Sequence, residues 1–347
     1  SLFLKMDIEG GETEVVKSCE SWMQTGKEIK FSCCTYHKKD DADTLERLFE
    51  NNGYYTEFSE GYMLFTYDKL IKYPYFRKGI IRASNRNFIN QTHVKIVIPI
   101  YKNTLDECEI KSLNQCCKIL SSYPVVFAKP QSLDISNLEK DYPQIETENF
   151  ADEYFADIVA YNSLMLSFEF YKRFSDCRYI LIYQLDAYVF RDELKEWCNK
   201  NYDYVGAPWL LKPKYRNFFL RIFLIIKSFH YFLVGKPFIK NKIGNGGFSL
   251  RKVSSHIQAV SEKSEKINHY IQKSKLRSKF NEDVFWATQN PEFKYPKFRE
   301  ALLFSIDMYP ELCFKVNGNR LPFGCHGWSK SDRAAFWNKL FISYELF

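Results

Sequence analysis

The chain has 347 residues, of which 46% are apolar and 26% are charged. This balance is typical of a globular protein, and the length suits two domains or one large α/β domain with an appendage. A net charge of +7 is too small to indicate a nucleic-acid-binding protein, but it suits a small anionic ligand or a membrane surface.

The first 85 or so residues alternate between strands and helices. A short apolar strand leads into the acidic turn Asp7–Glu12. The pattern then predicts a helix over 13–25, a strand over 29–35, a helix over 41–51, and strands over 54–58 and 62–67. This order is typical of the later half of a Rossmann-like sheet. The polar stretch 82–93 has no apolar period, so we predict a linker there.

The segment LKMDIEGGE, followed by a strand, a helix and Asn-Gly-Tyr, resembles the carboxy-terminal half of an FkbM-type S-adenosylmethionine-dependent methyltransferase. The resemblance implies that D-x-E-G sits beside an active site whose cofactor loop lies earlier in the chain. The first residue is Ser1 and the strand after it is already under way, so we expect an amino-terminally truncated fragment. Residues 1–85 would then bind S-adenosylmethionine only if the missing half is present. The alternative is that Asp7 and Glu9 only solvate a strand end.

The second expected domain, residues 86–347, begins with a buried strand over 94–101. A helix over 106–121 and a strand over 123–127 complete a right-handed crossover unit. One long aromatic helix is predicted over 151–174, a strand over 179–183, a helix over 193–200 and a closing helix over 329–347. The fold class is therefore α/β.

Asp186 follows the predicted strand 179–183, at the edge where open α/β sheets bind ligands. Transfer of a sugar from a nucleoside diphosphate builds negative charge on the leaving group, which Mg²⁺ or Mn²⁺ held by carboxylates neutralises. His326 lies between two glycines, and its imidazole could complete a metal site with Asp186. Each residue also has a plainer explanation, a helix cap or salt bridge for the aspartate and a structural role for the histidine.

Three other segments carry polar or aromatic signals. Residues 244–251 begin with a stretch of four residues of which three are glycines. Such a cluster implies positive φ or close approach of the backbone to a ligand. Residues 281–286 place two carboxylates at the head of an apolar helix, where burial can tune a general base, or where they merely solvate the helix start. Trp209 could stack on a sugar ring or pack in the core.

Residues 210–242 are aromatic and basic, and their helical pattern is apolar nearly all round. Such a segment suits a buried helical hairpin, or a helix at a membrane interface beside anionic lipid. We favour packing or a domain contact. The cysteines are scattered without zinc or redox spacing, which predicts reduced thiols in a cytoplasmic protein. No signal peptide opens the chain, and no apolar run reaches the ~18 residues of a membrane span.

The motifs VKIVIPIY, YQLDAYVF, DYVGAPW, GNGGFSLR, NEDVFW, FSIDMYP and PFGCHGW cover nearly all of residues 94–330. In this order they are similar to the DUF5672 family, a bacterial GT-A-like glycosyltransferase group, and some resemble segments of β-galactosyltransferase-type enzymes. Gln184-Leu185-Asp186 departs from the D-x-D that GT-A enzymes commonly use, having one carboxylate fewer.

The resemblance implies specific roles for residues of this chain. The nucleotide sugar would lie at Pro99, Tyr101, Lys129, Gln184 and Asp186. The sugar and acceptor pocket would be shaped by Trp209, Asn245, Gly246, Gly247 and Phe248. Asp186 and His326 would bind the metal. Asp283 would be the base of an inverting transfer, with Glu282 in reserve.

The sequence therefore predicts a glycosyltransferase that uses a nucleotide-sugar donor, with a UDP-sugar favoured, and Mn²⁺ or Mg²⁺. The acceptor would be a glycan or a lipid-linked glycan in cell-surface polysaccharide or lipopolysaccharide synthesis. The protein would be cytoplasmic, with contact to the inner face of the membrane through 210–242. The alternatives are a non-catalytic carbohydrate-binding or scaffold domain, and an S-adenosylmethionine-dependent O-methyltransferase in the full-length protein.

Overall fold

The structure is a computed structural model, and it divides the chain into two compact units, residues 1–91 and 92–347. The sequence places this boundary after residue 85. The predicted linker is partly wrong, because residues 82–84 belong to a strand and residues 92–93 begin another; its residues 86–91 lie outside the described part. The structure describes residues 2–59, 61–67, 70–85, 92–210, 218–233, 242–275 and 280–344.

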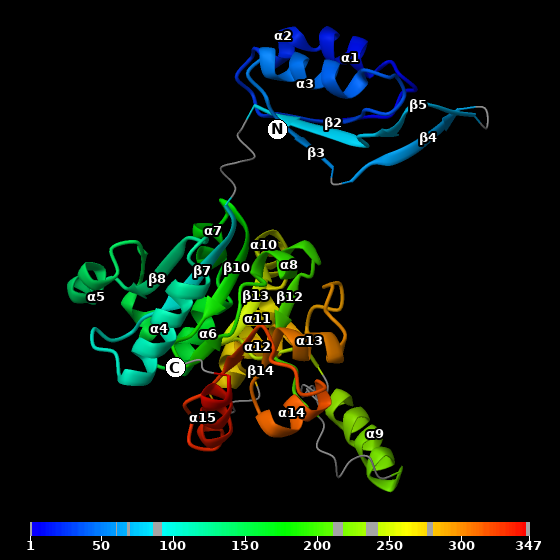
Figure 1. Ribbon diagram of the computed structural model, residues 1–347. Helices are drawn as coiled ribbons and strands as arrows, with labels where there is room; N and C mark the ends of the chain where they lie inside the picture. The colour runs from blue at the N-terminus through cyan, green and yellow to red at the C-terminus, as the bar shows by residue number, and fades with distance from the viewer. Residues whose placement is uncertain are drawn as a thin grey trace. The chain divides into compact units, whose positions relative to one another are not determined.

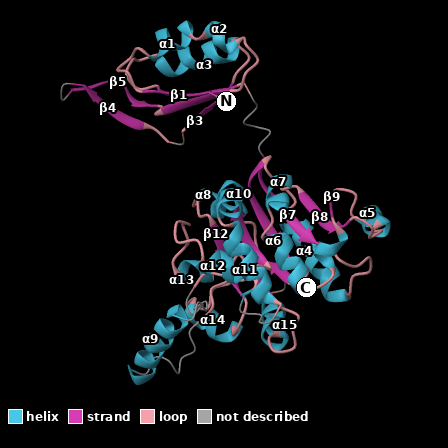
Figure 2. Ribbon diagram, turned by 180° about the vertical axis from the view of Figure 1, so that it is seen from behind, coloured by secondary structure: helices cyan, strands magenta, loops and turns pink. Residues whose placement is uncertain are grey.

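The first unit is a four-stranded sheet with three helices on one face (Figures 1 and 2). In sheet order the strands are β1 (Leu2–Met6), β2 (Ile29–Cys34), β6 (Ile80–Ser84) and β3 (Tyr55–Phe58). The helices are α1 (Glu12–Ser18), α2 (Glu20–Met23) and α3 (Asp41–Asn51). Strands β1 and β2 are parallel, whereas β6 runs antiparallel to both of its neighbours.

Two expectations for this unit need correction. The predicted helix 13–25 is broken at Cys19 into α1 and α2. Strand β4 (Met63–Tyr67) pairs with β5 (Leu70–Arg77) in a separate hairpin, and the sequence analysis missed both β5 and β6. The core of the unit lies between the sheet and the helices, where Phe31 of β2 packs near Phe49 of α3.

The second unit contains a six-stranded sheet in the order β12-β13-β10-β7-β8-β9. Its strands are β7 (Thr92–Pro99), β8 (Val125–Pro130), β9 (Glu146–Phe150), β10 (Cys177–Tyr183), β12 (Tyr204–Gly206) and β13 (Phe248–Lys252). The four strands from β10 to β9 run parallel, and β13 is antiparallel to β10 and β12. This arrangement confirms the predicted α/β class.

Helices cover both faces of this sheet, because its central strands are apolar on both sides. Ile96 and Ile98 of β7 join one buried cluster and Val97 joins the other. The first cluster takes in α4 (Glu107–Ile119), α5 (Ser136–Asp141) and α8 (Leu194–Asn199). The second takes in α6 (Ile158–Met165), α7 (Phe168–Arg173), α10 (Val253–Glu262), α11 (Ser264–Ser274) and α12 (Glu282–Thr288).

The single long helix predicted over 151–174 is wrong. The chain instead forms a 3₁₀ turn, η2 (Asp152–Phe155), followed by α6 and α7. Asp157 and Ser167 accept hydrogen bonds from the backbone amides of Ala160 and Phe170, and so act as N-caps that start two new helices. An apolar period alone does not reveal such interruptions.

A smaller sheet follows in the order β11 (Ala187–Val189), β15 (Gly324–His326) and β14 (Ser305–Ile306). It is accompanied by α13 (Phe298–Phe304), α14 (Pro310–Val316) and α15 (Ala334–Ser343). An aromatic cluster that includes Tyr188, Phe190, Trp337 and Phe341 holds β11 against α15. The ten cysteines of the chain are free thiols.

Helix α9 (Phe218–Leu233) is the described part of the aromatic and basic segment 210–242. Large apolar side chains of this helix are exposed, Ile225 at 69% among them, so α9 is not buried among the described residues, and the predicted domain contact stays a prediction. The flanks 211–217 and 234–241 lie outside the described residues. Among the helices that are described, none combines the length and the apolar character that crossing a membrane requires.

Candidate active site

The order of the larger sheet reverses beside β7. The chain moves from β7 to β8 and β9 on one side and then adds β10 on the other side. In open α/β sheets, ligands bind outside the carboxyl ends of the strands at such a reversal. A pocket of about 630 Å³ opens there, lined by residues that follow β7 and residues that follow β10.

Four of the five residues predicted to contact a nucleotide sugar line this pocket: Pro99, Tyr101, Gln184 and Asp186. Tyr101 is 65% exposed, so its ring is open to stacking by a planar ligand. Five polar residues that were not predicted from the sequence also line the pocket: Lys102, Glu109, Asp157, Tyr161 and Lys330.

Lys129 is the fifth residue, and its predicted contact with the nucleotide is not supported. Its side chain is buried, and its Nζ donates to the backbone oxygens of Pro130 and Leu133, at 3.2 and 2.7 Å. The amine therefore holds the turn after β8 instead of facing the pocket, whose lining does not include it.

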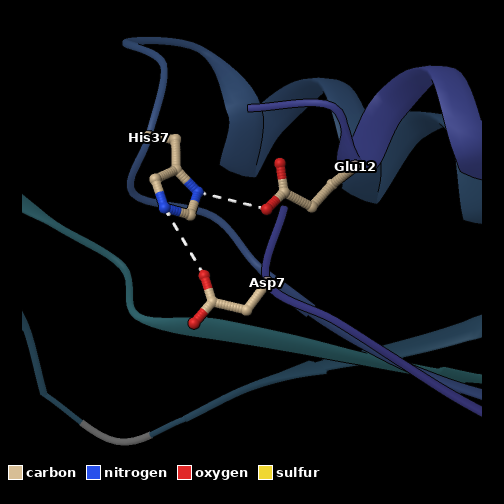
Figure 3. Close-up of side chains that lie close together, drawn as sticks. All are labelled: Asp7, Glu12 and His37. Atoms are coloured by element: carbon tan, nitrogen blue, oxygen red, sulfur yellow. Dashed lines mark hydrogen bonds and ion pairs between the residues drawn. The ribbon is translucent and has the colours of Figure 1, made fainter. Parts of the chain in front are cut away.

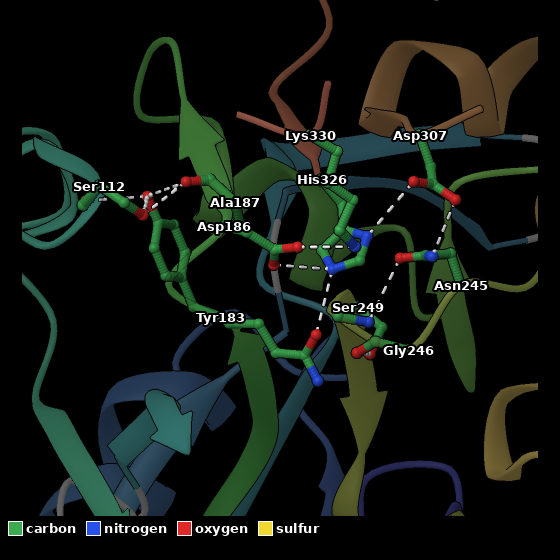
Figure 4. Close-up of polar contacts among 12 residues, drawn as sticks. Ser112, Tyr183, Asp186, Ala187, Asn245, Gly246, Ser249, Asp307, His326 and Lys330 are labelled. Atoms are coloured by element: carbon green, nitrogen blue, oxygen red, sulfur yellow. Dashed lines mark hydrogen bonds and ion pairs between the residues drawn. The ribbon is translucent and has the colours of Figure 1, made fainter. Parts of the chain in front are cut away.

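The smaller sheet brings two predicted residues together at the edge of the pocket (Figure 4). Strands β11 and β15 are antiparallel with Ala187 opposite His326, which places the histidine beside Asp186. His326 Nε2 lies 2.9 Å from Asp186 Oδ1 and 3.1 Å from Gln184 Oε1. The other ring nitrogen lies 3.3 Å from an oxygen of Asp307, which follows β14, the parallel neighbour of β15.

Neighbouring charges determine the protonation states of Asp186, Asp307 and His326. Burial by itself raises the pKa of Asp186, but His326 and Lys330, whose Nζ is 2.8 Å from Asp186 Oδ2, hold the pKa well below its usual range. Burial likewise opposes ionisation of Asp307, yet His326, Arg333 and Lys330 lower its pKa. The two carboxylates raise the pKa of His326 to about 9, although burial lowers it. Without a bound metal, the histidine is therefore a cation between two anions.

The glycine pair is required by close approach of protein side chains and not by positive φ, and the predicted approach of its backbone to a ligand stays a prediction. A Cβ on Gly247 would lie 2.1 Å from His326 Nε2 and 2.6 Å from Gln184 Oε1. A Cβ on Gly246 would lie 2.0 Å from Glu282 Oε1. The pair therefore separates two polar groups, and neither position tolerates a side chain in this arrangement.

Glu282 belongs to a buried ion pair. Its Oε1 lies 3.1 Å from a guanidinium nitrogen of Arg251, which also donates to Tyr171 and Ser249. Both partners are buried, and burial raises the pKa of Glu282. Arg251 holds Oε1 beside the glycine turn, while Oε2 is buried without a hydrogen-bond partner among the described residues. Because this ion pair fixes its carboxylate, Glu282 is better suited to positioning than to proton transfer.

Asp283 is the neighbouring carboxylate, and it is only partly buried. Burial, followed by the nearby charge of Glu282, raises the pKa of Asp283 to about 7. One carboxylate oxygen accepts a hydrogen bond from the amide of Val284. A carboxylate whose pKa lies near neutrality is suited to general-base catalysis.

Of the other residues predicted to shape the sugar pocket, Asn245 and Trp209 lie at the glycine turn, whereas Phe248 lies in the core. Asn245 has positive φ, and its amide donates to Asp307 at 3.0 Å, so it joins the site. The indole of Trp209 lies against Gly244, where a Cβ would be 2.0 Å from the ring. Phe248 is a correction: it is fully buried against Tyr183 and other aromatic rings and does not shape a sugar pocket.

The donor set at Asp186 fits a divalent cation. A carboxylate oxygen of Asp186 and the amide oxygen of Gln184 both lie close to His326 Nε2, and the amide oxygen and the nitrogen face Gly247, which has no side chain. Asp307 can accept the Nδ1 hydrogen of a neutral His326, which is the outer carboxylate that metal-binding histidines usually have. Lys330, which already pairs with Asp186, would have to share that carboxylate with the ion.

The sequence analysis did not select Asp307, Lys330 or Arg333. Asp307 offered a usable signal, because it follows a short apolar strand within the motif FSIDMYP, as Asp186 follows its own strand. Arg333 pairs with Asp307, but it lies in a polar stretch after β15 with no pattern of its own. Only the pairing of β14 with β15 shows that these residues meet.

A sequence profile of the family described as "Protein of unknown function (DUF5672)" matches residues 144–326, which is more than half of the chain. The match does not reach residues 1–85, so their methyltransferase resemblance stays a prediction. No relative is found among curated proteins.

Solved structures similar to the chain include three sugar transferases. The galactosyltransferase LgtC, in complex with donor and acceptor sugar analogues, is 14% identical over 67% of this chain and 86% of its own, with a TM-score of 0.42. The mannosyltransferase Ktr4p from S. cerevisiae is 13% identical over 56% of this chain and 63% of its own, with a TM-score of 0.35. Core-mannan synthase A from Aspergillus fumigatus, in a Mn/GDP form, is 11% identical over 62% and 75%, with a TM-score of 0.38.

Proposed function

The chain belongs to the DUF5672 family, and from this premise and its site geometry we propose that it is a glycosyltransferase using a nucleotide-sugar donor. The observation that carries the proposal is the pocket at the strand-order reversal, which combines an exposed tyrosine ring with an ionised carboxylate. A nucleotide base can stack on Tyr101, and its diphosphate would then lie toward Asp186 and Lys330 at the end of β10.

The leaving group of such a transfer is a nucleoside diphosphate. It gains negative charge as the bond between its terminal phosphate oxygen and the anomeric carbon of the sugar breaks. Lys330 lines the pocket and is the cation placed to face that charge. Asp186, Gln184 and His326 would hold a divalent ion, Mn²⁺ or Mg²⁺, which supplies further charge neutralisation when bound. A UDP-sugar is the donor we favour.

Asp283 is the proposed base of an inverting transfer to a glycan hydroxyl. Its raised pKa allows it to accept a proton near neutral pH, whereas Glu282 is paired with Arg251. Asn245, Gly246 and Gly247 shape the neighbouring turn, and Trp209 packs beside it. We place the acceptor sugar at this turn.

The exposed apolar helix α9 supports a membrane-associated acceptor. Residues 204–261 contain no aspartate or glutamate, while lysines and arginines lie on both sides of α9 and within it. A basic apolar helix of this kind binds the surface of an anionic membrane. We therefore propose a lipid-linked glycan as acceptor, consistent with cell-surface polysaccharide synthesis at the inner face of the membrane.

Thermal-shift screening of nucleotide sugars, with and without Mn²⁺, tests the donor site directly. We expect one nucleotide class to raise the melting temperature of the full chain, and a Tyr101→Ala variant to lose most of that shift. A Tyr344→Ala variant, which removes an exposed tyrosine of the carboxy-terminal region, is the control. Absence of stabilisation by every nucleotide tested would overturn the proposal.

The competing function is a non-catalytic carbohydrate-binding or scaffold domain. It predicts binding of glycans without consumption of a nucleotide sugar. Detection of released nucleoside diphosphate, with a mixture of cell-surface glycans as acceptors, separates the two. A methyltransferase activity of the full-length protein is a separate alternative, which binding of S-adenosylmethionine by this chain would support.

A further inference from the structure

The first unit holds a second cluster of polar side chains, at the carboxyl ends of its two parallel strands (Figure 3). Asp7 follows β1, His37 follows β2 after a short loop, and Glu12 begins α1. His37 Nδ1 lies 3.1 Å from Glu12 Oε1, and His37 Nε2 lies 3.5 Å from Asp7 Oδ1. One ligand atom of each residue lies within 4.8 Å of the others.

Glu12 is the buried member of this cluster. Its side chain is fully buried and its carboxyl group points at His37. Oε1 accepts the amide of Ile8 at 3.0 Å and faces the imidazole, but Oε2 has no hydrogen-bond partner among the described residues. A buried carboxylate oxygen without a partner is costly, and a metal ion is one group that would satisfy it.

Surrounding residues hold the three side chains in place. The hydroxyl of Tyr36 donates to Asp7 Oδ1 at 3.3 Å. The guanidinium of Arg77, which is buried, donates to the backbone oxygens of Tyr36 and His37 at 2.6 and 3.1 Å. Tyr36 thus ties the loop after β2 to the turn after β1, and Arg77 ties the same loop to β5, so the ligand positions are set by the fold of this unit.

We propose that Asp7, Glu12 and His37 bind a divalent transition-metal ion such as Mn²⁺, Co²⁺ or Zn²⁺. Two carboxylate oxygens and one imidazole nitrogen form a donor set that these ions accept. Ligand atoms about 2.1 Å from a common ion lie roughly 3–3.5 Å apart, and an imidazole binds an ion through one nitrogen. Glu12 and Asp7 face different nitrogens of His37, so the ion would bind at one nitrogen and the carboxylate at the other would rotate toward it. Asp7 is 56% exposed, which leaves one side of the ion open to water or a substrate.

This site is independent of the glycosyltransferase proposal, because its residues belong to the first unit alone. The test uses the full chain carrying His326→Gln, which removes the imidazole of the candidate site in the second unit. Binding of Co²⁺ is followed by its visible absorption and binding of Mn²⁺ by electron paramagnetic resonance. We expect this chain to bind one ion.

Asp7→Asn and His37→Gln are each added to the chain that carries His326→Gln, and each should weaken metal binding at least tenfold. Tyr36→Phe should weaken metal binding about tenfold, because it removes the hydrogen bond to Asp7. Asp43→Asn is the matched control, since Asp43 is an exposed acidic residue of α3 in the same unit. Melting curves verify folding, and because Asp7 is exposed its variant should stay folded. If the chain binds no ion, or if Asp7→Asn and His37→Gln bind as tightly as the control, the cluster is an ion pair bridged by the histidine and the proposal is wrong.

Discussion

Asp186 lines the pocket and Asp283 is the proposed base, and the surroundings of these two carboxylates move their pKa values in opposite directions. Asp186 faces His326 and Lys330, which hold its pKa well below the usual range. Asp283 is desolvated beside Glu282, and its pKa rises to about 7. One carboxylate therefore stays anionic while the other can exchange a proton, a separation that acid–base chemistry requires.

This difference predicts the pH dependence of transfer. Asp283 must lose its proton to act as a base, so kcat/KM should rise as pH increases toward about 7 and level off above it. Asp283→Asn should lower kcat by roughly 10²–10⁴-fold while donor binding is retained. Initial rates and donor titrations measure both effects.

Asp141→Asn, at an exposed position at the end of α5, is the control and should leave the rate unchanged. If Asp283→Asn keeps full activity, or if the rate shows no dependence on pH between about 5 and 7, Asp283 is not the base.

At the scale of elements, short strands and a glycine turn assemble the site. The pairing of β11 with β15 joins Asp186 to His326, and the pairing of β15 with β14 adds Asp307. In the turn before β13, Gly246 and Gly247 lie against Glu282, His326 and Gln184, where a side chain would not fit. Each of these elements spans few residues, so the site depends on packing more than on local propensity.

Gly247→Ala tests this dependence. The added methyl group would displace His326 or Gln184, and we expect the free energy of unfolding to fall by about 1–3 kcal/mol. Binding of Mn²⁺ and of the nucleotide sugar in the second unit should weaken as well. Chemical denaturation and donor titration check the two effects. Gly79→Ala is the control, because its Cβ would meet only the side chains of Ser59 and Met63, and it should change neither the free energy of unfolding nor donor binding strongly. If the two variants change both quantities equally, the proposed role of the turn is wrong.

Helix α9 makes a prediction at the same scale. Co-sedimentation with vesicles should show binding to membranes that contain anionic lipid and weaker binding to neutral ones, because the segment is basic and apolar. Replacing both Ile225 and Ile226 by Asp should reduce binding at least tenfold. Ile342→Asp, at a position 75% exposed on α15, is the control for loss of an exposed isoleucine. Binding that is insensitive to the α9 substitutions would exclude this helix as the contact.

At the scale of the whole molecule, the two units have separate cores. The core of the first unit contains only residues of that unit, and the other buried clusters contain only residues of the second. Units with independent cores need not unfold together. Calorimetry should therefore resolve two unfolding transitions. A bound nucleotide sugar should raise the melting temperature of only one of them. The variant Phe31→Ala should lower the melting temperature of the other transition, because Phe31 lies in the core of the first unit. If there is a single transition that both the nucleotide sugar and Phe31→Ala shift, the units unfold cooperatively.

Local patterns in the sequence determined the class of the fold and several positions of the site. Continuous apolar runs identified the buried strands that became β7 and β10, and the ends of these strands marked Pro99 and Asp186. The glycine pair indicated a crowded turn, and the structure places protein side chains against it. These features are encoded by neighbouring residues, so they can be read without knowledge of the tertiary structure.

Only the tertiary structure decided which distant residues meet. Asp307 and Lys330 reach Asp186 and His326 through pairing of two- and three-residue strands, which carry almost no sequence period. Lys129 has the charge expected of a phosphate ligand, yet its side chain leaves the end of β8 toward the backbone oxygens of Pro130 and Leu133. The helix breaks at Asp157 and Ser167 likewise depend on caps competing with an apolar period. Side-chain direction and strand pairing are set by the packed whole, because the free-energy differences that choose between them are not local.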